Sequence, residues 1–140
     1  MRIPIKVCFF AGGLRAMVSF LLTSKEPHIF GFVNAIVDSG SPATILGDID
    51  LKRMRISQIQ LRKLVGKKEP LLLGGGKVKT RVLENAHLKL GDYSIDVPIE
   101  VPVEETKGFS QTTILGVDFL LKTKFKFIFN PDKREAYFED

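Results

Sequence analysis

One short motif, Asp38-Ser39-Gly40, combines residue types that could carry out acid–base chemistry. It follows an apolar run, residues 32–37, that is typical of a buried strand. A carboxylate held at the end of such a strand could act as a general base on a water molecule. The same tripeptide is also an ordinary turn after a strand, in which Asp or Ser hydrogen-bonds its own backbone. The motif therefore needs support from the rest of the chain.

Two further segments of the sequence accompany the motif. Near the C-terminus, Ile114-Leu115-Gly116 is an apolar run that ends in glycine and is followed by Val117-Asp118-Phe119-Leu120. Between this segment and the motif lies a glycine triplet, Gly74-Gly75-Gly76, with strand-like flanks. Glycines at a hairpin tip allow positive φ angles and an opening motion over a ligand.

In this order, the three features resemble the retropepsin-like aspartic proteases, the single-lobed family that includes the retroviral enzymes. The resemblance extends over about residues 3–138. It implies an all-β, closed, barrel-like acid-protease fold of one lobe, with a flap hairpin and one or two short helices. The catalytic residues that it implies are Asp38, Ser39 and Gly40. For the flap and floor that contact substrate it implies Gly74, Gly75, Gly76 and Ala43, and for the structural support of the site Thr44, Ile114, Leu115 and Gly116.

Hydrolysis of a peptide by carboxylates needs two of them facing one water. One accepts a proton from the water, while the other, protonated, donates to the carbonyl oxygen. The chain has one Asp-Ser-Gly and no second Asp-Thr-Gly, so Asp38 would have to meet Asp38 of a second copy across a two-fold axis. Gly40 would allow the close approach, because it has no Cβ. By the resemblance, Ser39 would hydrogen-bond across that axis.

Two functions from different classes follow from this interpretation. The first is a homodimeric aspartic endopeptidase that binds extended peptides as an added strand between the flap and the catalytic floor. The second is a non-catalytic retropepsin-like module for dimerisation or peptide binding. The presence of Asp38 favours the enzyme, because a module that only binds has no use for a buried carboxylate pair.

The sequence also departs from the retroviral pattern at two positions. Pro42 stands where the retroviral enzymes tend to have an acidic residue, and Val117 where they tend to have an arginine. The salt bridge between those two positions is therefore absent. These departures make cellular or microbial relatives the closer comparison.

The composition of the 140 residues is typical of a single soluble globular domain spanning residues 1–140, with 44% apolar and 26% charged residues. The single cysteine, Cys8, excludes an internal disulfide and favours a reducing, cytoplasmic location. Cys8 itself is predicted to be a small buried side chain. With two histidines and one cysteine, the chain offers a poor set of metal ligands, and we expect no metal or cofactor. No uncharged apolar run reaches the ~18 residues of a membrane span, so no membrane partner is expected.

The net charge of +5 is unevenly distributed along the chain. Residues 51–68 contain seven basic and no acidic residues. A nucleic-acid patch is one interpretation, but the segment has no aromatic residue to stack on bases. A solvated face is the better interpretation, and no nucleic-acid partner is expected. Its buried side would consist of Met54, Ile56, Ile59, Leu61, Leu64 and Val65.

Patterns of alternation and turn residues predict a chain made mainly of strands. A strand buried on both faces is expected over 30–37, because that run is almost entirely apolar. Asp48 is expected to cap a short helix that ends at residue 53, and residues 117–122 to form a helical turn. Pro98 and Pro102 should place their strand at an edge or interrupt it, and residues 104–108 should form a mobile surface loop. The other predicted strands are residues 3–10, 15–23, 71–73, 77–83, 85–90, 93–101, 112–115, 126–130 and 135–139.

Overall fold

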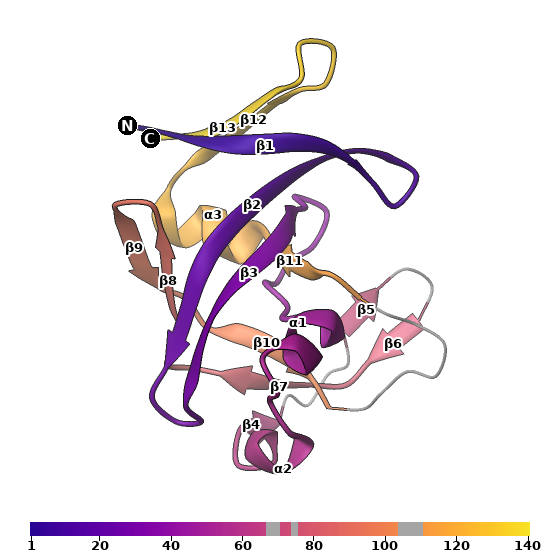
Figure 1. Cartoon of the computed structure of the whole chain (residues 1–140), viewed down its shortest axis with the longest axis vertical. Helices are drawn as coiled ribbons and strands as arrows, with labels where there is room; N and C mark the ends of the chain where they lie inside the picture. The colour runs from indigo at the N-terminus through magenta and orange to yellow at the C-terminus, as the bar shows by residue number, and fades with distance from the viewer. Residues whose placement is uncertain (67–70, 74–75, 104–110) are drawn as a thin grey trace.

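A computed structural model describes residues 1–66, 71–73, 76–103 and 111–140, and most of its elements are strands (Figure 1). The strands before residue 79 are β1 (Arg2–Phe10), β2 (Gly13–Ser24), β3 (Ile29–Val37), β4 (Val65–Gly66), β5 (Leu71–Leu73) and β6 (Gly76–Val78). The later strands are β7 (Thr80–Leu83), β8 (His87–Leu90), β9 (Tyr93–Asp96), β10 (Ile99–Pro102), β11 (Thr113–Leu115), β12 (Lys126–Asn130) and β13 (Glu135–Glu139). The helices are α1 (Asp48–Arg53), α2 (Gln58–Leu61) and α3 (Val117–Thr123).

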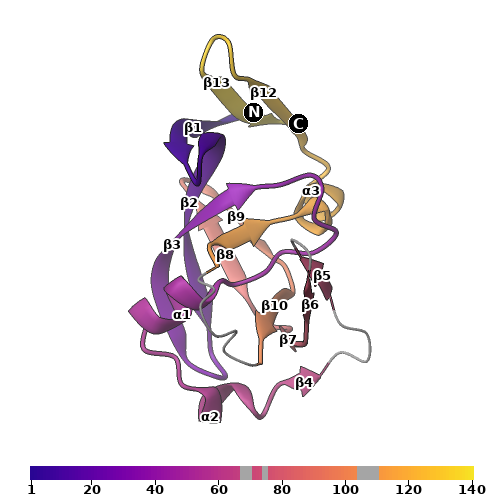
Figure 2. The same cartoon turned by 90° about the vertical axis from the view of Figure 1, so that its right-hand side faces the viewer.

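The described strands form three hydrogen-bonded sheets. The largest has eight strands, with the order β11-β3-β2-β1-β13-β12, while β8 pairs with β2 and β9 with β8. The second has the order β10-β7-β4, and the third is the hairpin β5–β6. Both views show the two ends of the chain together on β1 and β13, well away from β5–β6 (Figure 2). The prediction of an all-β, single-lobed fold is confirmed.

The first two predicted strands pair as a hairpin, and two predicted strands are each divided. The β1–β2 hairpin turns at Ala11 and Gly12, whose φ angles are 51° and 82°, as expected of a turn that matches the twist of its strands. One predicted strand, 77–83, is interrupted at Lys79. The other, 93–101, is interrupted before Pro98, which has no backbone N–H to donate, and β10 then lies at the end of its sheet. The prediction that the prolines place this strand at an edge or interrupt it is confirmed.

Strict alternation along β2 builds the centre of the core. Four inward residues of β2, from Ala16 to Leu22, are buried, and Val33 and Ala35 of β3 lie beside them on the same face of the sheet. Phe119, Phe125 and Phe138 add a cluster of aromatic rings with centroids 5.3–6.4 Å apart. Each fully buried side chain of this kind contributes about 1.5–3 kcal/mol. Burial on one face only is what fixes the register of these strands.

Several local predictions were wrong. The outward face of β3 is not buried, because Phe30 and Phe32 are each 67% exposed. Ile59, expected on a buried side, is 70% exposed. Cys8 is only half-buried. The helix cap is Gly47 rather than Asp48.

The basic segment contains one helix that the sequence pattern did not predict. In α2, the Ser57 side chain accepts from Gln60 N and the Gln60 side chain accepts from Ser57 N, so the two form a capping box. Leu61 packs into the core, which explains why so short a helix forms here. None of the helices that the structure describes is long and apolar enough to cross a membrane.

Candidate active site

Asp38 lies where β3 ends, in a tight turn with its side chain exposed to solvent. Its carboxylate Oδ1 accepts a hydrogen bond from Gly40 N at 2.8 Å, and its carbonyl accepts from Ser41 N at 3.1 Å. Its own N–H donates to Leu115 O at 3.0 Å. Ser39 and Gly40 are exposed beside it. The backbone of Asp38 is therefore fixed on both sides, and Oδ2 has no hydrogen bond to the described residues.

The predicted supporting strand lies next to β3. β11 is parallel to β3, with Ile114 opposite Ile36 and Leu115 opposite Val37. At Gly116 the chain passes so close to the turn that a Cβ there would lie 2.4 Å from the carbonyl oxygen of Ala43 and 2.8 Å from that of Ser41. Both neighbours are backbone atoms, so no larger residue can be accommodated without moving the turn. This is why the apolar run must end in glycine.

A buried hydrogen-bonded link joins the motif to the start of α3. Thr44, fully buried, donates its hydroxyl to Asp118 Oδ1 at 2.7 Å and its N–H to Asp118 Oδ2 at 2.9 Å. The same hydroxyl accepts from Gly116 N at 3.1 Å. Val117 N donates to Ser41 O at 2.9 Å. Thr44 thus lies at the centre of a network that holds the turn after Asp38 to the segment after β11.

The segment after the motif also joins two sheets. Ile45 exchanges backbone hydrogen bonds with Ile114 of β11, both at 2.9 Å. On its other side Ile45 bridges to Glu100 of β10, where Glu100 N donates to Thr44 O at 2.9 Å. Ala43 is buried beside it. The turn that contains Asp38 is therefore supported by β11 and β10 as well as by β3.

Helix α1 anchors the chain that enters β11. The buried carboxylate of Asp50 accepts from Thr113 Oγ1 at 2.6 Å and from Arg53 at 2.9 Å. Thr113 in turn accepts from Gly47 N at 2.9 Å, and Asp48 accepts from Gln111 N. Two acidic residues of one short helix thus fix the approach to the supporting strand.

Sequence reasoning missed the roles of Asp118 and Asp50. For Asp118 a signal existed, since it is an acidic residue in the first turn of a predicted helix, two positions after the supporting glycine. The partner, Thr44, was itself predicted as support. For Asp50 the sequence contains no comparable signal, because its partner lies 63 residues away.

The predicted flap falls partly outside the described residues. β5 and β6 form the expected antiparallel hairpin, with Leu73 opposite Gly76. Gly74 and Gly75 lie outside the described residues, as do residues 104–108 of the predicted surface loop. The substrate contacts expected of Gly74, Gly75 and Gly76 stay a prediction.

A half-buried apolar surface adjoins Asp38. Ile36 lies two residues before it on the outward face of β3. Met17 of β2 and Ile114 of β11 are the cross-strand partners of Ile36, one on each side, and both are half-buried. Among the described residues, no hydrogen bond joins Asp38 to a second carboxylate. A single copy therefore supplies one carboxylate and an apolar surface beside it.

Comparison with solved structures identifies the architecture. A retropepsin-like aspartic protease from Rickettsia conorii superposes with a TM-score of 0.59 at 18% identity, covering 99% of this chain and 89% of that one. The retroviral protease-like domain of Ddi1 from Leishmania major superposes with a TM-score of 0.51, also at 18% identity, covering 89% and 94%. The chain has the retropepsin-like fold. Neither a protein-family model nor a curated protein matches the sequence.

The fold prediction made from Asp38, the glycine triplet and Ile114-Leu115-Gly116 is confirmed over nearly the whole chain. At this level of identity the likeness concerns the fold alone. What Asp38 does must be argued from its own surroundings.

Proposed function

We propose that the protein is an aspartic endopeptidase that acts as a homodimer. The observation that carries this proposal is the combination of an exposed carboxylate, Asp38, with a turn that is held from below by Thr44, Asp118 and Gly116. A carboxylate fixed in this way loses little freedom when it binds a water and a substrate carbonyl. An ordinary turn would have no need of so much buried support.

The dimer is required by the chemistry. Carboxylate catalysis of hydrolysis uses one ionised and one protonated group on the same water, and each chain contributes one Asp38. A two-fold axis beside Asp38 would bring two such turns together, since a two-fold interface presents the same surface from both copies. The exposure of Asp38, Ser39 and Gly40 in the single copy is consistent with a face that becomes covered in the pair.

The substrate is an extended polypeptide with an apolar side chain next to the bond that is cut. The surface formed by Ile36, Met17 and Ile114 is half-buried and borders Asp38. An apolar side chain that covers it would remove apolar area from water on both partners. The peptide backbone would add as a strand beneath the β5–β6 hairpin.

Digestion of a mixed peptide pool at mildly acidic pH tests the proposal. The wild-type chain should release fragments, pepstatin should suppress them, and purified Asp38→Asn protein should release none. The cut sites should be enriched in apolar residues. If the wild type binds peptides but never cuts them, the alternative of a non-catalytic dimerisation or peptide-binding module replaces the enzyme.

A further inference from the structure

A hollow of about 760 Å³ opens on the outward face of β1, β2 and β3. Lys6, Cys8 and Phe10 line it from β1, and Met17 and Ser19 line it from β2. These residues share one face, because Lys6 is the cross-strand partner of Met17 and successive side chains of a strand alternate. The hollow is thus built mainly by the long N-terminal hairpin.

The strand pairings explain why the surface is concave here. β1 pairs with β2 only over Lys6–Phe10, and then leaves it to pair with β13 over Arg2–Ile5. β8 pairs with β2 farther along, at Leu21–Thr23. Between the stretch of β2 that pairs with β1 and the stretch that pairs with β8, these two strands diverge. The opening of the hollow lies there and is lined by Pro4, Val18 and Leu90. The opposite wall is α1, through Ile49 and Arg53.

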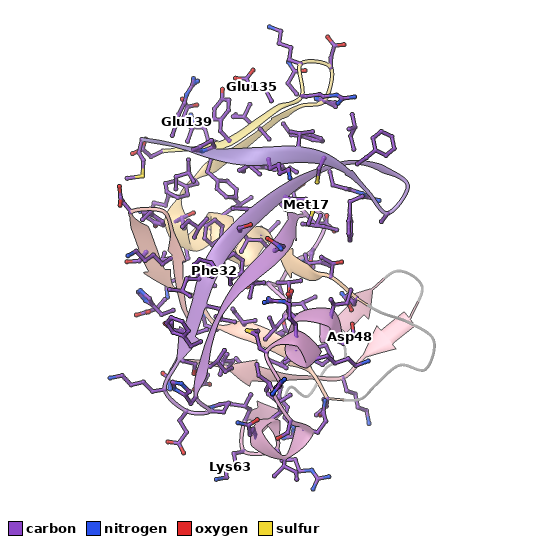
Figure 3. All side chains as sticks on the ribbon, viewed as in Figure 1. Met17, Phe32, Asp48, Lys63, Glu135 and Glu139 are labelled. Atoms are coloured by element: carbon purple, nitrogen blue, oxygen red, sulfur yellow. The ribbon has the colours of Figure 1, made fainter. Side chains whose placement is uncertain are left out.

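The hollow continues the surface beside Asp38. Met17 belongs to both, since it lines the hollow and is the cross-strand partner of Ile36. Figure 3 shows Met17 between β1 and the helix that begins at Asp48. A peptide whose scissile bond lies at Asp38 could therefore run over Met17 into the hollow without a change of face.

The lining combines apolar side chains with positive charge. Phe10 is 38% and Ile49 is 45% exposed. Lys6 is exposed and supplies the positive charge, whereas the half-exposed Arg53 is paired with Asp50 at 2.9 Å. The lining carboxylate, Asp50, is buried and already accepts from Arg53 and Thr113. A peptide that offers apolar side chains and a carboxylate within reach of Lys6 complements this surface.

We propose that this hollow is a second peptide-binding surface, which receives an acidic and apolar segment of the substrate away from the bond that is cut. The substrate role rests on the proposed endopeptidase function. The surface would raise the affinity for substrates that contain both elements, because a second contact on the same chain becomes intramolecular once the first has formed.

Binding can be measured without catalysis, on the full chain with Asp38→Asn. The probe is a fluorescent ten-residue peptide of Leu and Glu, followed by anisotropy at about 50 mM salt, where exposed charges are weakly screened. Lys6→Glu should weaken binding about five-fold or more, since it reverses one charge in the hollow. The matched control is Lys126→Glu, an exposed lysine on β12 that lies outside the hollow. Equal effects of the two variants, or no binding at all, would overturn the proposal.

The only cysteine of the chain gives an independent position for the bound peptide. Cys8 lines the hollow and is half-buried, so saturating peptide should slow its alkylation by a maleimide several-fold. Unchanged alkylation would place the peptide elsewhere. Equally tight binding of an oligonucleotide with the same charge would show a non-specific polyanion surface and also overturn the proposal.

The two proposals fail separately. Binding with Cys8 protection but no cleavage by the wild type would reject the endopeptidase and the substrate role, while the peptide surface remains. Cleavage that depends on Asp38, without binding in the hollow, would reject the second surface alone.

Discussion

Replacing Thr44 by valine should destabilise the protein far more than the loss of one exposed hydroxyl would. Valine keeps the shape of the side chain, but Asp118 Oδ1 keeps only the donor Phe119 N of its two donors at 2.7 Å, and Gly116 N loses its 3.1 Å acceptor at a fully buried residue. A hydrogen bond to a charged group contributes about 1.5–3 kcal/mol, and an unpaired buried donor costs about 1–3 kcal/mol. The two effects overlap, so we expect the free energy of unfolding to fall by about 3 kcal/mol.

Urea unfolding at a fixed protein concentration measures this change. Because the chain has no tryptophan, unfolding is monitored by far-ultraviolet circular dichroism. The matched control is Thr23→Val, because Thr23 is half-buried on the outward face of β2 and has no side-chain hydrogen bond to the described residues. The control should change the free energy of unfolding by no more than about 0.5 kcal/mol. If Thr44→Val cost less than about 1 kcal/mol, or no more than the control, the network around Thr44 would not be what holds the turn at Asp38.

Three further outcomes follow from the same geometry. Gly116→Ala should leave little folded, active protein in a solubility and activity screen, because its Cβ would meet backbone atoms of Ala43 and Ser41. The control Gly13→Ala should behave as wild type, because a Cβ there meets nothing within 4 Å. Equal behaviour of the two variants would contradict the close approach at Gly116. Asp38→Asn should reduce the cleavage rate at least about 10²-fold, since general acid–base catalysis alone contributes a factor of ~10² to 10⁴. The circular dichroism spectrum should be retained. Retained activity in the purified variant would point to another nucleophile. The cleavage rate should depend on pH as a bell-shaped curve with its maximum on the acidic side of neutrality, because a pair of catalytic carboxyls needs one ionised and one protonated member. A rate that still rises at about pH 9 would exclude such a pair.

The sequence predicted the parts of the site that are local. Asp38 after an apolar run, and Ile114-Leu115-Gly116 before a helical turn, are each recognisable within ten residues, and the structure places them side by side. Residue 116 is glycine because it lies against the backbone of the turn, where a Cβ would not fit. The resemblance to a known family was enough to predict that the two segments lie together.

The contacts made over long sequence separations could not be predicted in the same way. Asp50 and Thr113 lie 63 residues apart, and no pattern in either segment indicates that they meet. The outward face of β3 was predicted to be buried because Phe30 and Phe32 are apolar, yet burial depends on what packs against a face. In the described structure both phenylalanines remain 67% exposed. An apolar residue type by itself does not decide which face enters the core.

The claim that two copies share one active site is tested most directly by mixing wild-type and Asp38→Asn chains. After subunit exchange at constant total concentration, only pairs with two wild-type chains should cleave, so activity should follow the square of the wild-type fraction. An equal mixture should retain about one quarter of the wild-type rate. Activity that falls in proportion to the wild-type fraction, to about one half in the equal mixture, would show that each chain carries a complete site and would contradict the account.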